Sequence, residues 1–145
     1  MTKRIMKNYK IISKYIKHLD FQIPNSKVFA LLTKNISSYK INIDIKSNQL
    51  GGKLVEIEIS LNLNPVKEDF EKINTKIVYS AVIEIDEQLK DKLEIEKIIL
   101  IDVPTEIYPE LRKIFVFIFE NSGFKDVKIS KDVNFQKLYN HRKAQ

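Results

Sequence analysis

The sequence contains no cysteine and only two histidines, which removes several kinds of chemistry at once. Without cysteine there are no disulfides, no thiolate metal ligands and no cysteine nucleophile. Neither His18 nor His141 lies among carboxylates at the helical spacing of a metal site. We therefore predict no metal site and no histidine-based acid–base site, and we expect no cofactor.

Glycine is also scarce, with three residues in a chain of 145. The paired Gly51 and Gly52 lie between two predicted strands, whereas a phosphate-binding loop connects a strand to a helix. Glu56 and Glu58 share one side of a predicted strand, and we interpret this carboxylate pair as the solvent-exposed side of that strand. No catalytic motif is present, and the sequence does not indicate an enzyme.

No long apolar run occurs near the amino end of the chain. The apolar residues there are interrupted by Lys7, Lys10, Lys14 and Lys17. Neither a signal-peptide core nor a membrane span can be drawn through this pattern, so we expect a cytoplasmic protein without membrane insertion.

The composition is that of a soluble globular protein, with 43% hydrophobic and 30% charged residues. The length and the absence of internal repeats predict a single domain over residues 1–145. The formal charge of +6 raises the alternative of a basic nucleic-acid-binding module. However, the lysines are spread among 19 acidic residues without an aromatic and arginine stacking cluster, which favours a solvated lysine-rich surface.

Alternation of apolar and polar residues predicts four strands of an antiparallel sheet. In the first strand, Tyr15, Leu19 and Phe21 are expected to share one largely apolar face. Gly51 and Gly52 predict a tight hairpin between the second and third strands, because both glycines accept a positive φ. The four predicted strands cover residues 15–23, 41–46, 55–63 and 73–85.

The connection over residues 26–38 is too long for a tight hairpin and is unusually apolar. It contains Val28, Phe29, Leu31 and Leu32. These side chains must either pack on the core or remain available for a ligand, and base rates favour packing on the core.

The most apolar part of the chain begins at Asp102 and predicts a long helix that ends near Gly123. The stripe expected to face the sheet is Ile107, Leu111, Ile114, Phe115 and Ile118. Val116, Phe117 and Phe119 are expected on other sides of the helix, which is therefore apolar nearly all round. Such a helix is unstable in water by itself, so we expect a partner subunit to cover its second side.

The segments that flank this helix are less clearly defined. Residues 87–97 are a charged connection with one or two turns of helix, and residues 98–103 either extend the sheet or lead into the long helix. Pro109 is expected to kink or restart that helix. A last helix, capped by Ser130 or Asp132, should place Phe135, Leu138 and Tyr139 on one face. Strands followed by helices predict an α+β fold.

Motifs along most of the chain resemble the SecB family of export chaperones, in the family's order. Residues 15–25 resemble the opening Tyr-x-Lys-Asp-x-Ser-Phe-Glu-x-Pro-Asn. The signature Cys-Pro-x-x-Leu-Phe-Pro-Tyr-Ala-Arg is similar to the region of Pro104, Tyr108, Pro109 and Arg112. The closing Gly-Phe and Pro-Ile-x-Phe-x-x-Leu-Tyr resemble Gly123, Phe124, Val133, Asn134, Phe135, Leu138 and Tyr139.

The resemblance implies a four-stranded antiparallel sheet with one long helix on a face and a short carboxy-terminal helix. It implies an ATP-independent holdase without cofactors that binds unfolded or precursor polypeptides in apolar grooves and passes them to the SecA motor. It also implies a homo-oligomer, a dimer of dimers with the long helices between the sheets. The client-binding residues would be Val28, Phe29, Leu31 and Leu32, and the interface residues Phe115, Val116, Phe117 and Phe119.

The chain departs from the family pattern in its charge. Family members are typically acidic and contact the motor through carboxylates on the sheet. Here the corresponding positions are His18, Gln22 and Lys76, which should weaken an electrostatic contact with a basic partner. A SecB-like chaperone of a toxin–antitoxin system, or of another dedicated client, is therefore an alternative.

Overall fold

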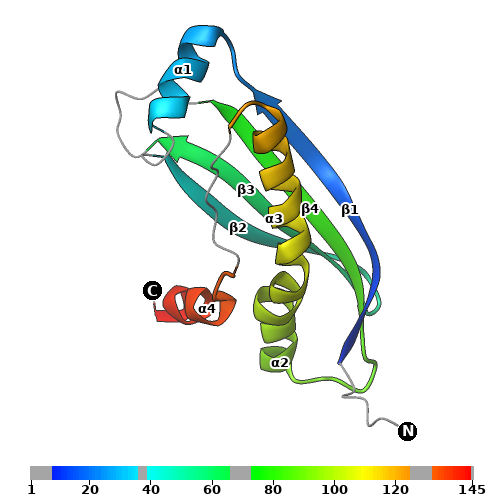
Figure 1. The fold of residues 1–145 in the computed structure, drawn as a ribbon. Helices are drawn as coiled ribbons and strands as arrows, with labels where there is room; N and C mark the ends of the chain where they lie inside the picture. Colours follow the sequence, from blue (N-terminus) through cyan, green and yellow to red (C-terminus); the bar gives the residue numbers. More distant parts are fainter. Residues whose placement is uncertain (1–7, 36–38, 66–72, 125–131, 145) are drawn as a thin grey trace, which may run out of the picture.

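The protein, in a computed structural model, forms a four-stranded antiparallel sheet with helices on one face (Figure 1). The structure describes residues 8–35, 39–65, 73–124 and 132–144. The sheet order is β1-β4-β3-β2, so β1 and β2 are its two edge strands. The strands are β1 (Tyr9–Gln22), β2 (Tyr39–Gly51), β3 (Leu54–Pro65) and β4 (Asn74–Ile85). The predicted α+β fold is confirmed. Strand β1 begins earlier than its alternation indicated, β2 and β3 extend beyond their predicted ranges at both ends, and β4 agrees to within one residue.

The hairpin between β2 and β3 forms where the paired glycines predict it. Gly51 and Gly52 have φ angles of 121° and 57°, in the region that residues with a side chain rarely adopt. The register pairs Ile43 with Leu61 and Ile45 with Ile59, so the apolar residues of both strands share one face. That face is the one covered by the long helix, and we call the opposite side the open face.

Two bulges in β1 change the faces predicted for that strand. The register against β4 shifts between Ile11 and Ser13 and again between Ile16 and His18. An extra residue reverses the alternation beyond it, because side chains on a strand alternate with a period of two. Tyr15 is therefore opposite Ser80, on the open face, whereas Leu19 is opposite Ile77, on the helix face. The prediction of one shared face for these side chains was wrong.

The apolar connection after β1 contains a helix, α1 (Ser26–Asn35), which periodicity did not identify. The Asn25 side chain accepts a hydrogen bond of 2.9 Å from the Val28 backbone N–H, as a residue that caps a helix start does. One side of α1 is buried through Val28 and Leu32. Core packing, the interpretation favoured by base rates, therefore holds for these two residues.

The long helix starts earlier than its apolar stripe indicated. Helix α2 (Lys92–Lys97), the π-helical η2 (Ile98–Asp102) and α3 (Val103–Asn121) follow one another without interruption. Residues 98–103 thus lead into the helix and do not extend the sheet. The start is capped by Asp91, whose side chain accepts a hydrogen bond of 3.0 Å from the Leu93 N–H, and not by Asp102. The wider π turn ends at Asp102, two residues before Pro104, which has no N–H to donate.

Helix α3 continues through Pro109 and ends at Asn121, two residues before the predicted glycine, Gly123. Gly123 has a φ of 102°, and the next residue, Phe124, donates a backbone hydrogen bond of 3.1 Å to the Phe119 carbonyl. This arrangement closes the helix end, as a left-handed residue after the last turn does in many helices.

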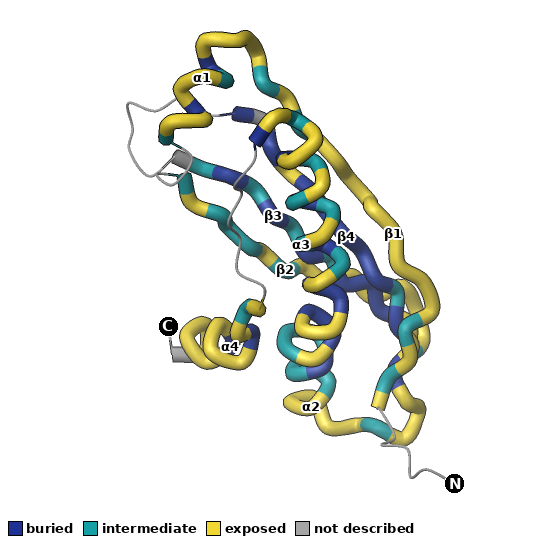
Figure 2. The backbone as a smooth tube through the Cα atoms, in the orientation of Figure 1, coloured by how far each residue is buried: buried dark blue, intermediate teal, exposed yellow. Residues whose placement is uncertain are grey.

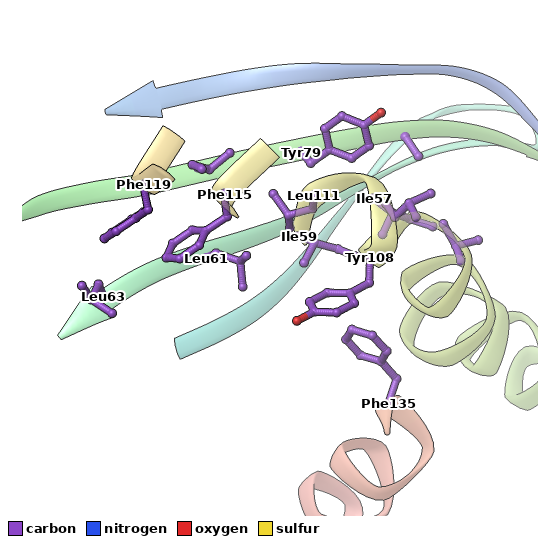
Figure 3. Close-up of a cluster of buried hydrophobic side chains, with 14 of the residues drawn as sticks. Ile57, Ile59, Leu61, Leu63, Tyr79, Tyr108, Leu111, Phe115, Phe119 and Phe135 are labelled. Carbon is purple, nitrogen blue, oxygen red and sulfur yellow. The ribbon is translucent and has the colours of Figure 1, made fainter. Parts of the chain in front are cut away.

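The core lies between α3 and the helix face of β3 and β4 (Figure 2). The buried stripe recurs every four residues, and it consists of Val103, Ile107, Leu111, Phe115 and Phe119. Figure 3 shows Leu111, Phe115 and Phe119 directed toward the strands. The Phe115 and Phe119 rings stack with centroids 4.6 Å apart, and Phe21 of β1 meets Phe119 edge-on at 5.1 Å.

The last helix, α4 (Phe135–Ala144), packs beside the start of the long helix (Figure 1). Its first turn is capped by Asn134, whose side chain accepts a hydrogen bond of 2.9 Å from the Lys137 N–H. This corrects the expected cap at Asp132; Ser130 lies outside the described residues. Phe135 and Tyr139 are buried, as expected of an apolar face, but Leu138 is 46% exposed.

Candidate functional site

The outer edge of β2 is the first of two features that could receive another polypeptide. Strand β2 pairs with β3 on one side, and no described strand pairs with its other side. Its backbone N–H and C=O groups along that edge can therefore accept an additional strand. The helix-facing Ile43 and Ile45 supply apolar side chains beside this backbone.

Two adjoining hollows lie along that edge, between β2, the start of the long helix and α4. One has a volume of about 220 Å³ and the other about 590 Å³, and both are lined by Leu100. We call them together the β2 groove. The smaller hollow is lined by Ile43, Asp44, Ile45, Leu100, Leu138, Tyr139, His141 and Arg142. The larger is lined by Ser47, Lys92, Leu93, Ile95, Glu96, Ile99 and Leu100.

Helix α4 forms one wall of the β2 groove and is attached at both of its ends. Near its start, the buried Phe135 ring meets Tyr108 of α3 at 6.0 Å (Figure 3). Near its end, the Lys143 ammonium and the Tyr139 hydroxyl both contact the Glu96 carboxylate at 3.0 Å. The Lys143 contact, and then the Tyr139 hydrogen bond, lower the pKa of Glu96. The Phe135 ring thus holds the wall near its start, and the two polar contacts of Glu96 hold it near its end.

The second feature is an apolar surface at the opposite edge of the sheet. Ile16 and Leu19 of β1 are opposite Tyr79 and Ile77, which places them on the helix face. They are nevertheless 44% and 50% exposed. Phe117 is 64% exposed. Glu110 of α3 forms an ion pair with Lys14 of β1, so its side of the helix is turned toward β1. Phe117 is seven residues, or about two helical turns, after Glu110 and therefore lies on the same side. We call Ile16, Leu19 and Phe117 the β1–α3 surface.

The predicted client-binding residues are not equally accessible. Val28 and Leu32 are buried at 4% and 1% exposure, so they support the fold of the protomer. Phe29 is partly buried, with its ring 5.0 Å from that of Phe124. Leu31 is exposed on the outer side of α1. In this conformation only Leu31, and part of Phe29, could touch another molecule.

The predicted interface residues also divide into two groups. Phe115 and Phe119 are 1% exposed because they face their own sheet, so the expectation that Phe119 lies on another side of the helix was wrong. The physical reason is the helical period, because residues four apart lie on one helix face. Phe119 is four residues after Phe115 and eight after Leu111, so it continues the buried stripe. Val116 is partly buried and Phe117 exposed. Only these two remain candidates for contact with a second subunit.

The open face holds a polar cluster that the sequence interpretation missed. Glu56 is 7% exposed, and its carboxylate accepts hydrogen bonds from the Ser80 hydroxyl at 2.6 Å and from the Tyr15 hydroxyl. Lys17, the extra residue of the second β1 bulge, reaches Glu56 at 3.2 Å and Glu58 at 2.8 Å. The Ser80 and Tyr15 hydrogen bonds lower the pKa of Glu56 to about 2. Glu56 is thus a buried structural anion, and not part of a solvent-exposed side as expected.

The three positions where the resemblance to the SecB family led us to expect acidic residues also lie on the open face. His18 is opposite Val78, Gln22 is opposite Asn74, and Lys76 is opposite Asp20. The carboxylate of Asp20 therefore has a lysine as its cross-strand neighbour, so this part of the sheet presents no block of negative charge.

Metal-binding clusters and membrane-spanning helices are both missing from the described part of the chain. Within residues 8–35, 39–65, 73–124 and 132–144, no group of three or more histidine, aspartate or glutamate side chains could hold a metal ion. None of the helices formed by these residues is both long and apolar enough to span a bilayer.

Comparison with solved structures identifies the class of protein that has this fold. A SecB-like chaperone of Mycobacterium tuberculosis, solved in complex with a ChAD peptide from an antitoxin, superposes with a TM-score of 0.63. The match covers 87% of this chain and 88% of that one at 10% sequence identity, so it concerns the fold alone. The antiparallel sheet with a long helix on one face is thus a fold that this chain shares with a SecB-like chaperone.

Sequence comparison identifies the family. The family described as "Preprotein translocase subunit SecB" matches residues 2–145. A putative protein-export protein SecB of Pelagibacter ubique is 37% identical over 135 residues, which is 93% of this chain and 96% of the relative. A protein-export protein SecB of Gluconobacter oxydans is 27% identical over 142 residues, 90% of this chain and 80% of the relative. The chain belongs to the SecB family, as its motifs indicated, and the family and fold support a chaperone role.

Proposed function

We propose that this protein is an ATP-independent holdase that binds non-native polypeptides, preproteins for export among them, along the β2 groove. The observation that carries the proposal is the combination of an open strand edge with apolar hollows beside it. The family relationship supports export as the process served, which would place the protein in the cytoplasm.

The chemistry of the groove suits a client without fixed structure. An extended segment can pair its backbone with the edge of β2, as in other cases of strand addition to a sheet. Every second side chain of that segment would then point into the hollows, where Leu100, Ile99 and Leu138 provide apolar contact. Backbone pairing is independent of sequence, and the apolar contacts require only that the client expose hydrophobic residues.

We further propose that the β1–α3 surface is covered by a second copy of the chain, within a dimer of dimers. Apolar side chains beside an open strand edge are a liability in a solitary protein, because the edge can pair with other chains. Of the four interface residues expected from the sequence, the proposal keeps Phe117 and the neighbouring Val116 and gives up Phe115 and Phe119.

Helix α1 contributes less to client binding in this proposal than the sequence indicated. Leu31 is 46% exposed and can extend the client-binding surface, with Phe29 beside it, whereas Val28 and Leu32 hold α1 on the core. A client would contact Leu31 after leaving the β2 groove or from a neighbouring subunit.

Delivery to the SecA motor would depend on the charge of the open face. The open face carries His18, Gln22 and Lys76 where acidic side chains would attract a basic partner segment. This charge pattern favours the second candidate, a SecB-like chaperone for a dedicated client such as an antitoxin. Binding of purified SecA at low salt would distinguish the two, since the second candidate predicts none.

The test is suppression of aggregation when a chemically unfolded protein is diluted into buffer with an equimolar amount of this protein. The decisive variant is Leu138→Asp in the β2 groove, and Leu50→Asp on the hairpin is its control. These two leucines are 46% and 49% exposed, so neither substitution places a charge in the core. We expect the first variant to lose most of the suppression and the second to keep it. Light-scattering traces identical with and without the wild-type protein would exclude holdase activity.

The oligomer is tested by the mass in solution. Ile16→Lys with Phe117→Lys places two charges on the β1–α3 surface, where both native side chains are exposed in the protomer. We expect a shift from the oligomer toward the monomer, with the circular dichroism of the fold retained. A wild-type protein that is monomeric at micromolar concentration would contradict this part of the proposal.

A further inference from the structure

The wall of the β2 groove formed by α4 is strongly basic. The helix has the sequence FQKLYNHRKA, which contains Lys137, His141, Arg142 and Lys143 and no acidic residue. His141 and Arg142 line the smaller hollow next to the apolar Leu138 and Tyr139. Apolar contact and positive charge are therefore provided by the same short stretch of one helix.

The opposite end of the groove adds another cation. Lys92 is exposed and lines the larger hollow, and it forms none of the ion pairs found among the described residues. The one carboxylate of this hollow, Glu96, is already bound by Lys143 and Tyr139. A carboxylate brought by a client would thus meet unneutralised positive charge at Lys92.

The balance of charges along the groove is positive. The cations that line the groove are Lys92 and Arg142. A third cation, Lys143, lies outside the lining and forms an ion pair with the lining carboxylate Glu96. Asp44 also borders the smaller hollow, but it is opposite Ser60 and therefore projects to the open face. Even if Asp44 is counted, three cations stand against two carboxylates.

We infer that the β2 groove selects unstructured segments in which acidic residues alternate with apolar ones. This inference rests on the proposed function and adds a substrate class to it. On a segment paired with β2, alternate side chains enter the hollows, and the residues between them remain at the rim. Aspartate or glutamate at the rim would lie near Arg142 and Lys92, whereas lysine there would be repelled.

The experiment compares three short unstructured peptides with the same apolar residues. They differ at two positions expected at the rim of the groove, where one peptide has Asp at both, the second Asn at both and the third Lys at both. Fluorescence anisotropy measures the binding of each peptide to the full chain. An exposed ion pair changes a binding affinity by a few fold. Two such ion pairs should therefore make the Asp peptide bind about three to ten times more tightly than the Asn peptide. The Lys peptide should bind more weakly than both, and the differences should shrink at about 0.5 M salt.

Three variants assign the effect to the groove. Lys92→Gln and Arg142→Gln should each weaken binding of the Asp peptide more than binding of the Asn peptide, so that the ratio of the two affinities falls. The positive charge of Arg142 helps to lower the pKa of Glu96, the residue that holds α4 through Lys143. Replacing Arg142 could therefore loosen α4, whereas Lys92→Gln leaves this attachment intact. Lys113→Gln is the control, since Lys113 is exposed on α3 and does not line the groove.

The outcomes separate the inference from the proposed function. If the Asn peptide binds but the Asp and Lys peptides have equal affinity, the charge preference is refuted while groove binding stands. An unchanged preference in both groove variants also refutes it. If none of the peptides binds, the proposed function fails, and the inference fails with it. Tighter binding of the Asp peptide that is lost in Lys92→Gln and kept in Lys113→Gln supports it.

Discussion

The buried carboxylate of Glu56 should make the stability of this protein depend on pH, and Glu56→Gln should reduce that dependence. In the folded protein the Ser80 and Tyr15 hydroxyls and the Lys17 ammonium favour the charged carboxylate, and its pKa is about 2 compared with an ordinary value of 4.5. In the unfolded chain these partners are absent, so the pKa returns to the ordinary value.

The sign and size follow from this difference in pKa. A carboxyl whose pKa is lower in the folded state adds stability above its unfolded pKa and loses it as the pH falls, here from about 4.5 to about 2. The full difference would correspond to about 3 kcal/mol. Lys17 has a side chain that is 40% exposed, and water screens its charge, so we expect about 1–2 kcal/mol.

Urea unfolding at pH 7 and at pH 3 measures the effect in the wild-type protein and in Glu56→Gln. We expect the variant to be less stable at pH 7 by about 1–2 kcal/mol and to lose less stability than the wild-type protein on acidification. Glu58→Gln is the matched control, because Glu58 also contacts Lys17 but has a more exposed side chain. Equal free energies of unfolding for wild type and Glu56→Gln at pH 7, or equal losses on acidification, would refute the reasoning.

Three further predictions concern other parts of the fold. Phe115→Ala should lower the free energy of unfolding by about 3–5 kcal/mol, whereas Phe117→Ala should leave the unfolding of a diluted, monomeric sample nearly unchanged; equal effects in urea titrations would contradict the assignment of faces. Gly123→Ala should destabilise by about 1–3 kcal/mol, because φ is 102° and the added Cβ would lie 2.9 Å from the Phe29 ring; an unchanged melting temperature would contradict this. Glu96→Gln removes the charge that holds Lys143, so hydrogen exchange in α4 should accelerate while exchange in β3 stays the same.

Local patterns in the sequence were enough to predict several elements of the fold. Alternation identified four strands, the adjacent glycines located the β2–β3 hairpin, and Gly123 marked the end of the long helix. These features were predictable because a strand has a side-chain period of two, and because positive φ favours glycine wherever it is required. The order of motifs along the chain likewise indicated the SecB family, because each motif is a short run of neighbouring residues.

Tertiary structure alone decided which apolar side chains are available to other molecules. Leu31 and Leu32 are neighbours of the same chemical type, yet one is exposed and the other buried, because only one side of α1 meets the core. Glu56 is a buried anion because Ser80 of β4 and Tyr15 of β1 donate hydrogen bonds to it across strands, and a bulge in β1 adds Lys17 on the same face. The β2 groove joins β2, the long helix and α4, which are distant in sequence, so no local period could reveal it.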